Sequence, residues 1–477
     1  MVDTYATARS MLADLKSKQV SARELLDAHL ARNDEVEARI NAVIETDIPR
    51  AMKDAAAIDN ARARGAALGP LAGLPMTIKD GFDVENMPAS AGAKGFHGRA
   101  KDCDDATVVA AARRAGAVIW GKTNVPYMLS DIQSYNEIYG TTNNPYDVTR
   151  VPGGSSGGAA AALATGVTPL EIGSDIGGSL RHPANFCGVT SLKPTWGAID
   201  GRGHIPPPPD GYYECDLGVY GPMARNTDDL KLLWSVLRGT PEQARRDIKG
   251  ARVAVWDSEA SWPLARDVKD GVKRAADALA KAGAHVEHAK PAIDGQYLME
   301  VYTTILTPIV ANDMPAQMID AFAAMREADA RIVAEGGEGA ATATFRLRAS
   351  APHREIVTAQ IARQKLKDVL AEFFGRYDVL LMPISPVAPF PHMQEGSFAD
   401  RLLTVDNETV PYNNLLDWIS VATALHAPAL AVQAGQSAAG LPIGVQVVGP
   451  WHGEDRLFDF AAAVEEGTGG FRPPPGV

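Results

Sequence analysis

Two serines flanked by paired glycines limit the possible folds and functions of this chain more than any other feature of its sequence. Ser155 lies in the run GGSSGG (153–158), and Ser179 follows two further glycines 24 positions later. Glycine reaches backbone conformations with φ > 0 and has no side chain to keep a ligand from the main chain. The pattern therefore predicts two tight turns with exposed backbone N–H groups. We interpret the two serines as the hydroxyls of one active site.

The residues around each turn indicate what the turns could do. The first runs into residues 159–164, which are strong helix formers, so a helix is expected to begin directly after it. In the second, the N–H groups of Ile176, Gly177 and Gly178 come just ahead of the Ser179 hydroxyl. Consecutive N–H donors beside a nucleophile are what an oxyanion hole needs. Either motif alone is also compatible with an ordinary turn.

A serine is a weak nucleophile at pH 7, so a base must take its proton. Residues 70–80, PLAGLPMTIKD, predict a short apolar strand with a lysine at its end. Most lysines are solvated surface charges. Burial beside Met76 and Ile78 would lower the pKa of Lys79 from its usual value of about 10.4 toward neutrality. Lys79 is therefore the candidate base.

Several segments, in this order and spacing, resemble the amidase signature family. The resemblance is most specific over about residues 70–230 and extends toward both ends of the chain. The segments are GLPMTIKD (73–80), TNVPYMLSDIQSYNEIYGTTNNPYD (123–147), GGSSGG (153–158), GSDIGGSLRHPANFCGVTSLKPT (173–195), GPMARNTDDL (221–230), YDVLLMP (377–383) and GLPIGVQVVGPWHGEDRLFDFAAAVE (440–465).

The resemblance implies a role for each of three side chains. Lys79 would be a neutral base, Ser155 a proton relay that follows a cis peptide bond, and Ser179 the nucleophile. It also implies that the N–H groups of residues 176–179 hold the oxyanion. Leu129 and Ser130, in the segment YMLS, would line the acyl pocket, although an apolar core role for this segment stays open.

The fold that the resemblance implies is a single α/β domain spanning residues 1–477. A large mixed β-sheet would be covered by helices on both sides. The residues agree with this, because a helical pattern at 105–116 precedes a buried strand at 117–120. Helices are also expected at about 4–18, 21–41, 50–65, 266–282 and through most of 296–372, with Ser21 and Glu24 as a capping box.

Composition excludes several classes of protein. Lys plus Arg number 46 against 58 for Asp plus Glu, so the net charge is −12 and no basic surplus indicates a nucleic-acid partner. The three cysteines are too few and too scattered for a disulfide framework or a zinc site. The charged N-terminus shows no secretory signal, which predicts a cytoplasmic protein. Residues 418–453 carry no charge, but prolines and glycines break them into strand-length pieces, so no membrane span is expected.

Other interpretations of the same residues are less consistent with the sequence. Gly153, Ser155 and Gly157 match a nucleophile elbow of α/β-hydrolases, but residues 149–152 are a poor strand because they end in proline. His182 is close to Ser179 in sequence, and we expect a structural role rather than that of a base.

Three further segments carry weaker signals. His285 and His288 are three residues apart, yet no ligand cluster converges with them, so no metal is predicted. The loop at 200–216 contains four prolines, Tyr212 and Tyr213, and could wall the pocket or lie on the surface. Thr423 and His426 stand where family members commonly have Asn and Gly, and a bulky His426 could narrow the site.

The leading functional hypothesis is hydrolysis of a carboxamide, an anilide or a carbamate (urethane) without metal or organic cofactor, with esters also reacting. The partner would be a small-molecule substrate and the protein a monomer or a homodimer. One alternative is the A subunit of a glutamyl-tRNA(Gln) amidotransferase, which uses the same catalytic core. The other is a non-catalytic scaffold of the same fold.

Overall fold

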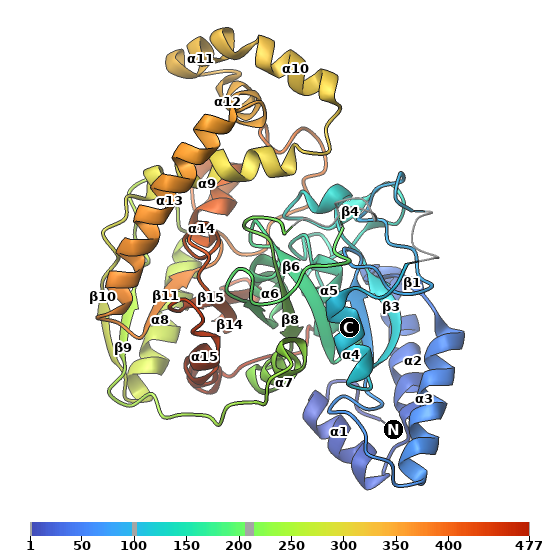
Figure 1. The fold of residues 1–477 in the computed structure, drawn as a ribbon. Helices are drawn as coiled ribbons and strands as arrows, with labels where there is room; N and C mark the ends of the chain where they lie inside the picture. The colour runs from blue at the N-terminus through green and yellow to red at the C-terminus, as the bar shows by residue number, and fades with distance from the viewer. Residues whose placement is uncertain (1, 98–102, 206–213, 477) are drawn as a thin grey trace.

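The computed structural model describes residues 2–97, 103–205 and 214–476. Its centre is an eight-stranded mixed sheet in the order β10-β9-β11-β15-β14-β7-β8-β6 (Figure 1). β10, β9 and β11 run parallel to one another, whereas the remaining neighbours are antiparallel. The strands are β6 (Leu170–Asp175), β7 (Thr190–Lys193), β8 (Val219–Ala224), β9 (Arg252–Val255), β10 (His285–His288), β11 (Val379–Pro383), β14 (Ala429–Gln436) and β15 (Pro442–Val448).

Helices cover both faces of this sheet. One face packs against α7 (Thr227–Arg238), α8 (Arg266–Lys281) and α15 (Glu454–Thr468), and the other against α5 (Gly157–Ala164) and α6 (Arg181–Cys187). The expected α/β fold, a large mixed sheet between helical layers, is therefore confirmed. The division of the chain into one domain stays a prediction.

A second, three-stranded sheet brings the lysine to the serines. Its order is β1 (Val43–Thr46), β3 (Val118–Thr123) and β2 (Pro75–Lys79), with β2 parallel to β3. Every residue of β2 is buried, as its apolar sequence predicts. β2 packs against β6 of the large sheet, so Lys79, the last residue of β2, lies close to the end of β6.

The N-terminal helices support the three-stranded sheet. They are α1 (Ala8–Ser17), α2 (Ala22–Ile40) and α3 (Ile48–Ala63), and α4 (Thr107–Arg114) precedes β3. The expected capping box is present at the start of α2, where the Ser21 hydroxyl accepts from the Glu24 N–H and the Glu24 carboxylate accepts from the Ser21 N–H.

Two buried helices begin next to the two serines. α5 begins two residues after Ser155, and α6 begins two residues after Ser179. α5 consists almost entirely of glycine and alanine and is wholly buried, which fits a helix that passes close to neighbouring backbone. At Gly158, for example, a Cβ atom would lie 2.4 Å from the backbone nitrogen of Asn124.

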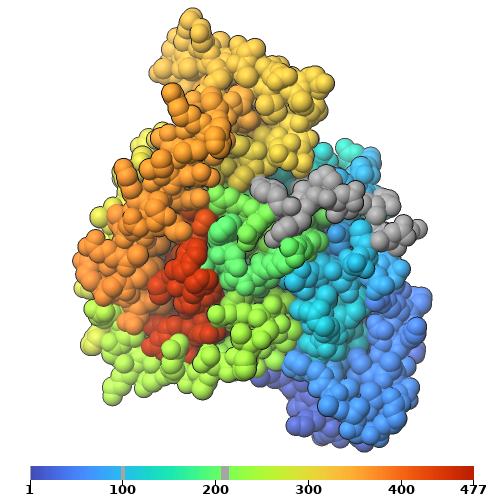
Figure 2. Space-filling model, in the orientation of Figure 1, coloured from blue at the N-terminus to red at the C-terminus, as the bar shows by residue number. Residues whose placement is uncertain are grey.

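A helical extension rises from the body of the molecule. α9 (Gly295–Val310), α10 (Ala316–Ala324), α11 (Arg326–Glu335), α12 (Ala340–Ala349) and α13 (His353–Phe374) form it. Figure 2 shows its yellow and orange segments at the top of the molecule. The expected break lies between α11 and α12, where Gly336, Gly337 and Gly339 have positive φ.

One expectation about the C-terminal third is wrong. The uncharged sequence from residue 418 predicts strand-length pieces throughout. The segment begins instead within α14 (Asp417–Ala424), and only the part after Pro428 forms strands. No helix in the described part of the chain is long and apolar enough to cross a membrane.

Candidate active site

Lys79 and Ser155 meet at the end of β2. The Lys79 Nζ lies 2.8 Å from the Ser155 Oγ and 2.9 Å from the Ser174 Oγ, and the Ser174 carbonyl oxygen is 3.4 Å away. All three side chains are buried. The structure thus brings the predicted base and the predicted relay into direct hydrogen-bonding contact.

The surroundings of Lys79 favour a neutral amine. Burial lowers the pKa of Lys79 from 10.5 to about 7, although the charges of Asp175 and Glu171 oppose this shift. Within the described residues no carboxylate forms an ion pair with Lys79. The neighbouring carboxylate of Asp80 pairs instead with Lys122, at 2.6 Å. An amine that titrates near neutral pH can accept a proton from a hydroxyl.

The first serine turn depends on its glycines. The peptide bond between Gly154 and Ser155 is cis, as the resemblance implies. A Cβ atom on Gly154 would lie 2.4 Å from the carbonyl oxygen of Gln133. The Ser134 hydroxyl donates to the Gly153 carbonyl and accepts from the Gly157 N–H, which fixes both ends of the turn.

A buried ion pair holds the second serine turn. Both carboxylate oxygens of Asp175 accept from the Arg181 guanidinium at 3.0 Å. Burial alone would raise the pKa of Asp175, but the charge and hydrogen bonds of Arg181 lower it far below the usual range. Because each side chain belongs to one end of the turn, their pairing closes the loop around Ser179. The Ser156 N–H donates to the Ser179 carbonyl at 3.2 Å and ties the two turns together.

The predicted oxyanion donors differ in their availability. The Gly178 N–H donates to Asp175 Oδ1 at 2.8 Å, so this structure commits it to the turn. Among residues 2–97, 103–205 and 214–476, no acceptor is found for the N–H groups of Ile176, Gly177 and Ser179. Three of the four expected donors are therefore open. The Tyr302 hydroxyl donates to the Ile176 carbonyl at 2.8 Å and fixes the direction of that peptide.

The two serines face one cavity of about 1210 Å³. Ser155, Ser174 and Ser179 contribute to its wall, as do Ile176 and Gly177. No hydrogen bond joins the hydroxyls of Ser155 and Ser179 in the described part of the structure. The relay from Ser179 to Ser155 therefore stays a prediction, in a cavity that both serines share.

The rest of the cavity is largely apolar and comes from distant parts of the chain. Leu129 and Ser130, expected in the acyl pocket, both line it. The helical extension contributes an apolar wall that consists of Met299, Leu306, Ile309, Val310, Met314, Met318 and Phe345. The same extension also contributes polar residues, which are Gln296, Glu300, Thr303, Thr307, Asn312, Asp313, Thr344 and Arg348. Because the surface of the cavity is nevertheless largely apolar, it suits a ligand with a large apolar part.

Four residues in contact with the site are not apparent from the sequence motifs alone. Ser174 contacts Lys79, and His204 lies 2.9 Å from the Ser174 hydroxyl. Tyr302 comes from α9, and Asp417 lines the cavity from α14. Burial raises the pKa of Asp417 to about 7 against a hydrogen bond from Asn414. Ser174 lies inside the family segment GSDIGGS, and His204 lies in the loop at 200–216 that could wall the pocket. Tyr302 and Asp417 have no comparable signal in the sequence.

Residues considered as alternatives lie elsewhere or serve the scaffold. His182 Nε2 is 3.0 Å from the Leu415 carbonyl oxygen, and burial lowers the pKa of His182 to about 3. A nucleophile elbow requires a strand directly before the serine, and residues 149–152 form no strand. In the described part of the chain, no group of three or more His, Cys, Asp or Glu side chains could hold a metal ion.

The expected influence of His426 on the site is not found. His426 stacks on Trp196 with ring centroids 4.8 Å apart, and its Nε2 lies 2.8 Å from Asp216 Oδ1. It does not line the cavity. Thr423, the other departure, accepts a hydrogen bond from Arg181 and supports the second turn. Tyr212 and Tyr213 lie outside the described residues.

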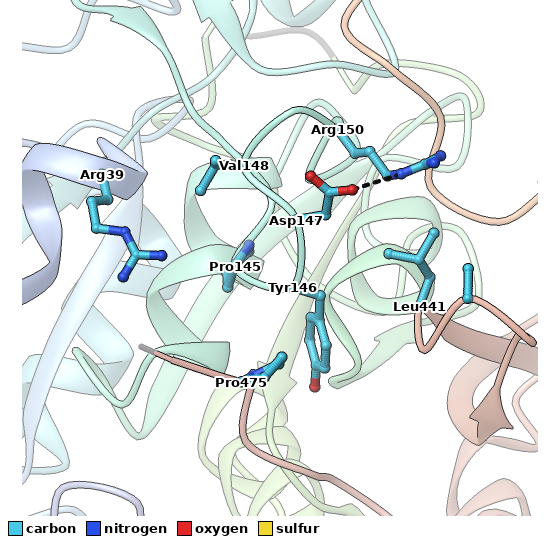
Figure 3. Close-up of a pocket in the computed structure, with 9 residues that line it drawn as sticks. Arg39, Pro145, Tyr146, Asp147, Val148, Arg150, Leu441 and Pro475 are labelled. Atoms are coloured by element: carbon cyan, nitrogen blue, oxygen red, sulfur yellow. Dashed lines mark hydrogen bonds and ion pairs between the residues drawn. The ribbon is translucent and has the colours of Figure 1, made fainter.

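A second cavity, of about 330 Å³, lies away from these residues (Figure 3). Its two arginines are already engaged, because Arg39 donates to the Gly476 carbonyl and Arg150 pairs with Asp147. Neither Ser155, Ser179 nor Lys79 contributes to its wall. Of the two cavities, only the larger one contains Ser155 and Ser179.

Comparison with known proteins places these features in a family. A family model described as Amidase matches residues 24–458. One curated relative is the A subunit of the glutamyl-tRNA(Gln) amidotransferase from Acidothermus cellulolyticus. The chain is 32% identical to it over 489 residues, covering 96% of this chain and 94% of that relative.

The similarity to solved structures extends over nearly the whole chain. An inhibitor-bound complex described as vestigial and related to the origins of an s-triazine catabolic enzyme has 28% identity and a TM-score of 0.80, covering 98% of this chain and 100% of that one. A 6-aminohexanoate cyclic dimer hydrolase bound to substrate has 25% identity and a TM-score of 0.79, covering 99% of each chain. The chain therefore belongs to the amidase signature family, as its motifs predict.

Proposed function

We propose that this protein hydrolyses the C–N bond of amides that carry a large apolar group, through an acyl-enzyme on Ser179. One observation carries the proposal: a buried amine with no carboxylate partner among the described residues lies 2.8 Å from the Ser155 hydroxyl, in a cavity that Ser179 shares. A hydroxyl beside a base, next to open backbone N–H donors, is an arrangement suited to acyl transfer.

The proposed reaction begins with proton transfer. Ser179 Oγ attacks the carbonyl carbon while its proton passes to Ser155, whose own proton moves to Lys79. The N–H groups of Ile176, Gly177 and Ser179 stabilise the negative oxygen that forms. When the C–N bond breaks, Ser155 gives a proton to the departing amine and regains one from Lys79.

The second half of the reaction regenerates the enzyme. Water attacks the acyl-enzyme carbonyl, and its proton follows the same path through Ser155 to Lys79. Breakdown of the second tetrahedral intermediate releases the acid and returns the proton to Ser179. Esters fit the same steps with an alcohol as the leaving group. Carbamates fit them with an alkoxycarbonyl group on Ser179 when the amine departs.

The apolar cavity supports the choice of substrate. The seven apolar side chains of its helical wall, which alternate with polar residues such as Glu300 and Arg348, would bind an alkyl or aryl group better than the polar side chain of glutamine. The similar solved structure of a 6-aminohexanoate cyclic dimer hydrolase supports a hydrolase rather than an amidotransferase.

The A subunit of a glutamyl-tRNA(Gln) amidotransferase is the second candidate. The curated relatives favour it, because eight of them carry that name at 29–32% identity over nearly the whole chain. This candidate requires that the chain releases ammonia from glutamine within a complex, whereas the first requires activity of the chain alone.

One panel of substrates separates the candidates. The purified chain is assayed on aliphatic amides, aryl anilides, carbamates and glutamine, with Ser179→Ala as the matched variant. We expect turnover of apolar amides that the substitution abolishes. Ammonia release from glutamine alone would favour the amidotransferase candidate. No turnover together with no labelling by a serine-directed fluorophosphonate would indicate a non-catalytic scaffold.

A further inference from the structure

His204 contacts the proposed base through one intervening hydroxyl. Its Nε2 lies 2.9 Å from the Ser174 Oγ, which in turn lies 2.9 Å from the Lys79 Nζ. His204 also lines the cavity that contains Ser155 and Ser179. None of the reaction steps above uses it.

The oxygens around a neutral Lys79 limit the ways in which its two N–H bonds and its lone pair can be arranged. A neutral amine has two N–H bonds and one lone pair, and three oxygens surround Lys79. The Ser174 carbonyl can only accept. If the Ser174 hydroxyl also accepts, the lone pair is left for the Ser155 O–H. If the Ser174 hydroxyl donates instead, it occupies the lone pair, and Lys79 can no longer take a proton from Ser155.

The direction of the Ser174 hydroxyl is therefore decisive, and the Nε2 of His204 lies within hydrogen-bonding distance of it. Burial lowers the pKa of His204 to about 3, with a smaller contribution from the Lys79 charge, so the ring is neutral and one of its nitrogens is an acceptor. The ring is held in place by edge contact with Phe82 and by Tyr220, both with centroids 4.9 Å away. The Ile205 N–H donates to the Gly81 carbonyl at 2.9 Å and fixes the backbone next to it.

We propose that the Nε2 of His204 accepts a hydrogen bond from the Ser174 hydroxyl. This bond keeps the lone pair of Lys79 directed at Ser155. His204 is then a positioning residue, because it acts on the base through Ser174. The inference rests on the proposed function, since it assigns a purpose to the base of that reaction.

A double-mutant cycle tests whether His204 acts through Ser174. We expect His204→Leu to lower kcat on the order of tenfold, the rate equivalent of one neutral hydrogen bond, with KM little changed. In the Ser174→Ala background, which has no hydroxyl to orient, the same substitution should cause no further loss. His204→Gln, whose amide oxygen can accept near the position of Nε2, should retain most activity. Equal losses from His204→Leu in both backgrounds would overturn the proposal.

A measurement without turnover distinguishes this inference from the proposed function. Nitrogen NMR of the histidine-labelled protein should show Nε2 of His204 unprotonated and hydrogen-bonded, with its resonance displaced in Ser174→Ala. A proton on Nε2 would overturn the inference even if Ser179→Ala abolishes activity. Conversely, full turnover by Ser179→Ala would contradict the proposed function and leave the NMR result standing. Unchanged thermal midpoints of the His204 variants would show that they fold.

Discussion

The Nζ of Lys79 lies 2.8 Å from the Oγ of Ser155, and the nearest carboxylate along the chain, that of Asp80, is paired with Lys122. The lysine is therefore buried with hydroxyls rather than with a counter-ion. In the proposed reaction this arrangement leaves the amine available as a base, which has consequences for rate, stability and pH dependence.

The acid limb of the pH–rate profile should report Lys79. Since burial lowers the pKa of Lys79 to about 7, kcat/KM should rise with pH through about 7 and level off above it. The pKa of Asp417 is also raised to about 7, so Asp417→Asn serves as the control. The limb should persist in that variant. A flat profile from about pH 6 to 9, the range in which a depressed lysine would titrate, would contradict an uncharged amine.

Removing the lysine should stabilise the protein while it abolishes activity. The unfolded chain binds a proton at Lys79 up to about pH 10, whereas the folded protein releases it near 7. Stability should therefore rise with pH between these values. Lys79→Met should raise the free energy of unfolding at pH 7 on the order of 3 kcal/mol and by less at pH 10. Urea denaturation at both pH values measures it, and an equal gain at both would be inconsistent with a titration effect.

Much of the site could be predicted from the sequence. Lys79, Ser155 and Ser179 carry local signals, which are the end of an apolar strand and two glycine-rich turns, and the helix after the first turn follows from its alanines. Tyr302 has no such signal, because its contact with the site depends on which segments pack together. For His204 the sequence offers only a loop that could wall the pocket, and not the contact with Ser174. The fold places His204 next to Ser174, near the end of β6.

Leu129 and Ser130 are expected in the wall of the cavity, whereas the part of the wall that the helical extension contributes could not be predicted, for a different reason. Met, Leu and Ile on a helical face look the same whether they pack against protein or face an empty cavity, so α9 and α10 gave no sign of a binding site. The helix α14 could not be distinguished in sequence because its uncharged residues resemble the strands that follow it. Its partners, among them Arg181, which donates to the Ile419 carbonyl, are far away in sequence.

The ion pair beneath the second serine turn should contribute strongly to stability. Asp175→Asn leaves the buried Arg181 without its counter-ion, and loss of one partner of a buried pair costs about 3 kcal/mol. We expect a corresponding fall in the urea midpoint, together with lower kcat as the turn loosens. The exposed pair of Lys273 and Asp277 provides the control, since Asp277→Asn should leave the midpoint unchanged. Similar effects of both substitutions would mean that the buried pair does not hold the turn.

The helical extension should determine the preference for apolar substrates. Met318 is 44% exposed and lines the cavity, whereas Met325 is 42% exposed and does not. Met318→Asp places a charge in the apolar wall, so it should lower kcat/KM for amides with long alkyl or aryl groups on the order of tenfold and affect short amides little. Met325→Asp is the matched control. Equal effects on long and short amides, or an equal effect of Met325→Asp, would exclude this wall as a specificity determinant.

The most direct test of the account is to locate the nucleophile by covalent labelling. The protein is treated with a serine-directed fluorophosphonate, digested, and its modified peptide identified by mass spectrometry. We predict a single adduct on Ser179, formed faster as the pH rises through about 7 and absent from Ser179→Ala. An adduct on Ser155, or no adduct on a protein that turns over amides, would contradict it.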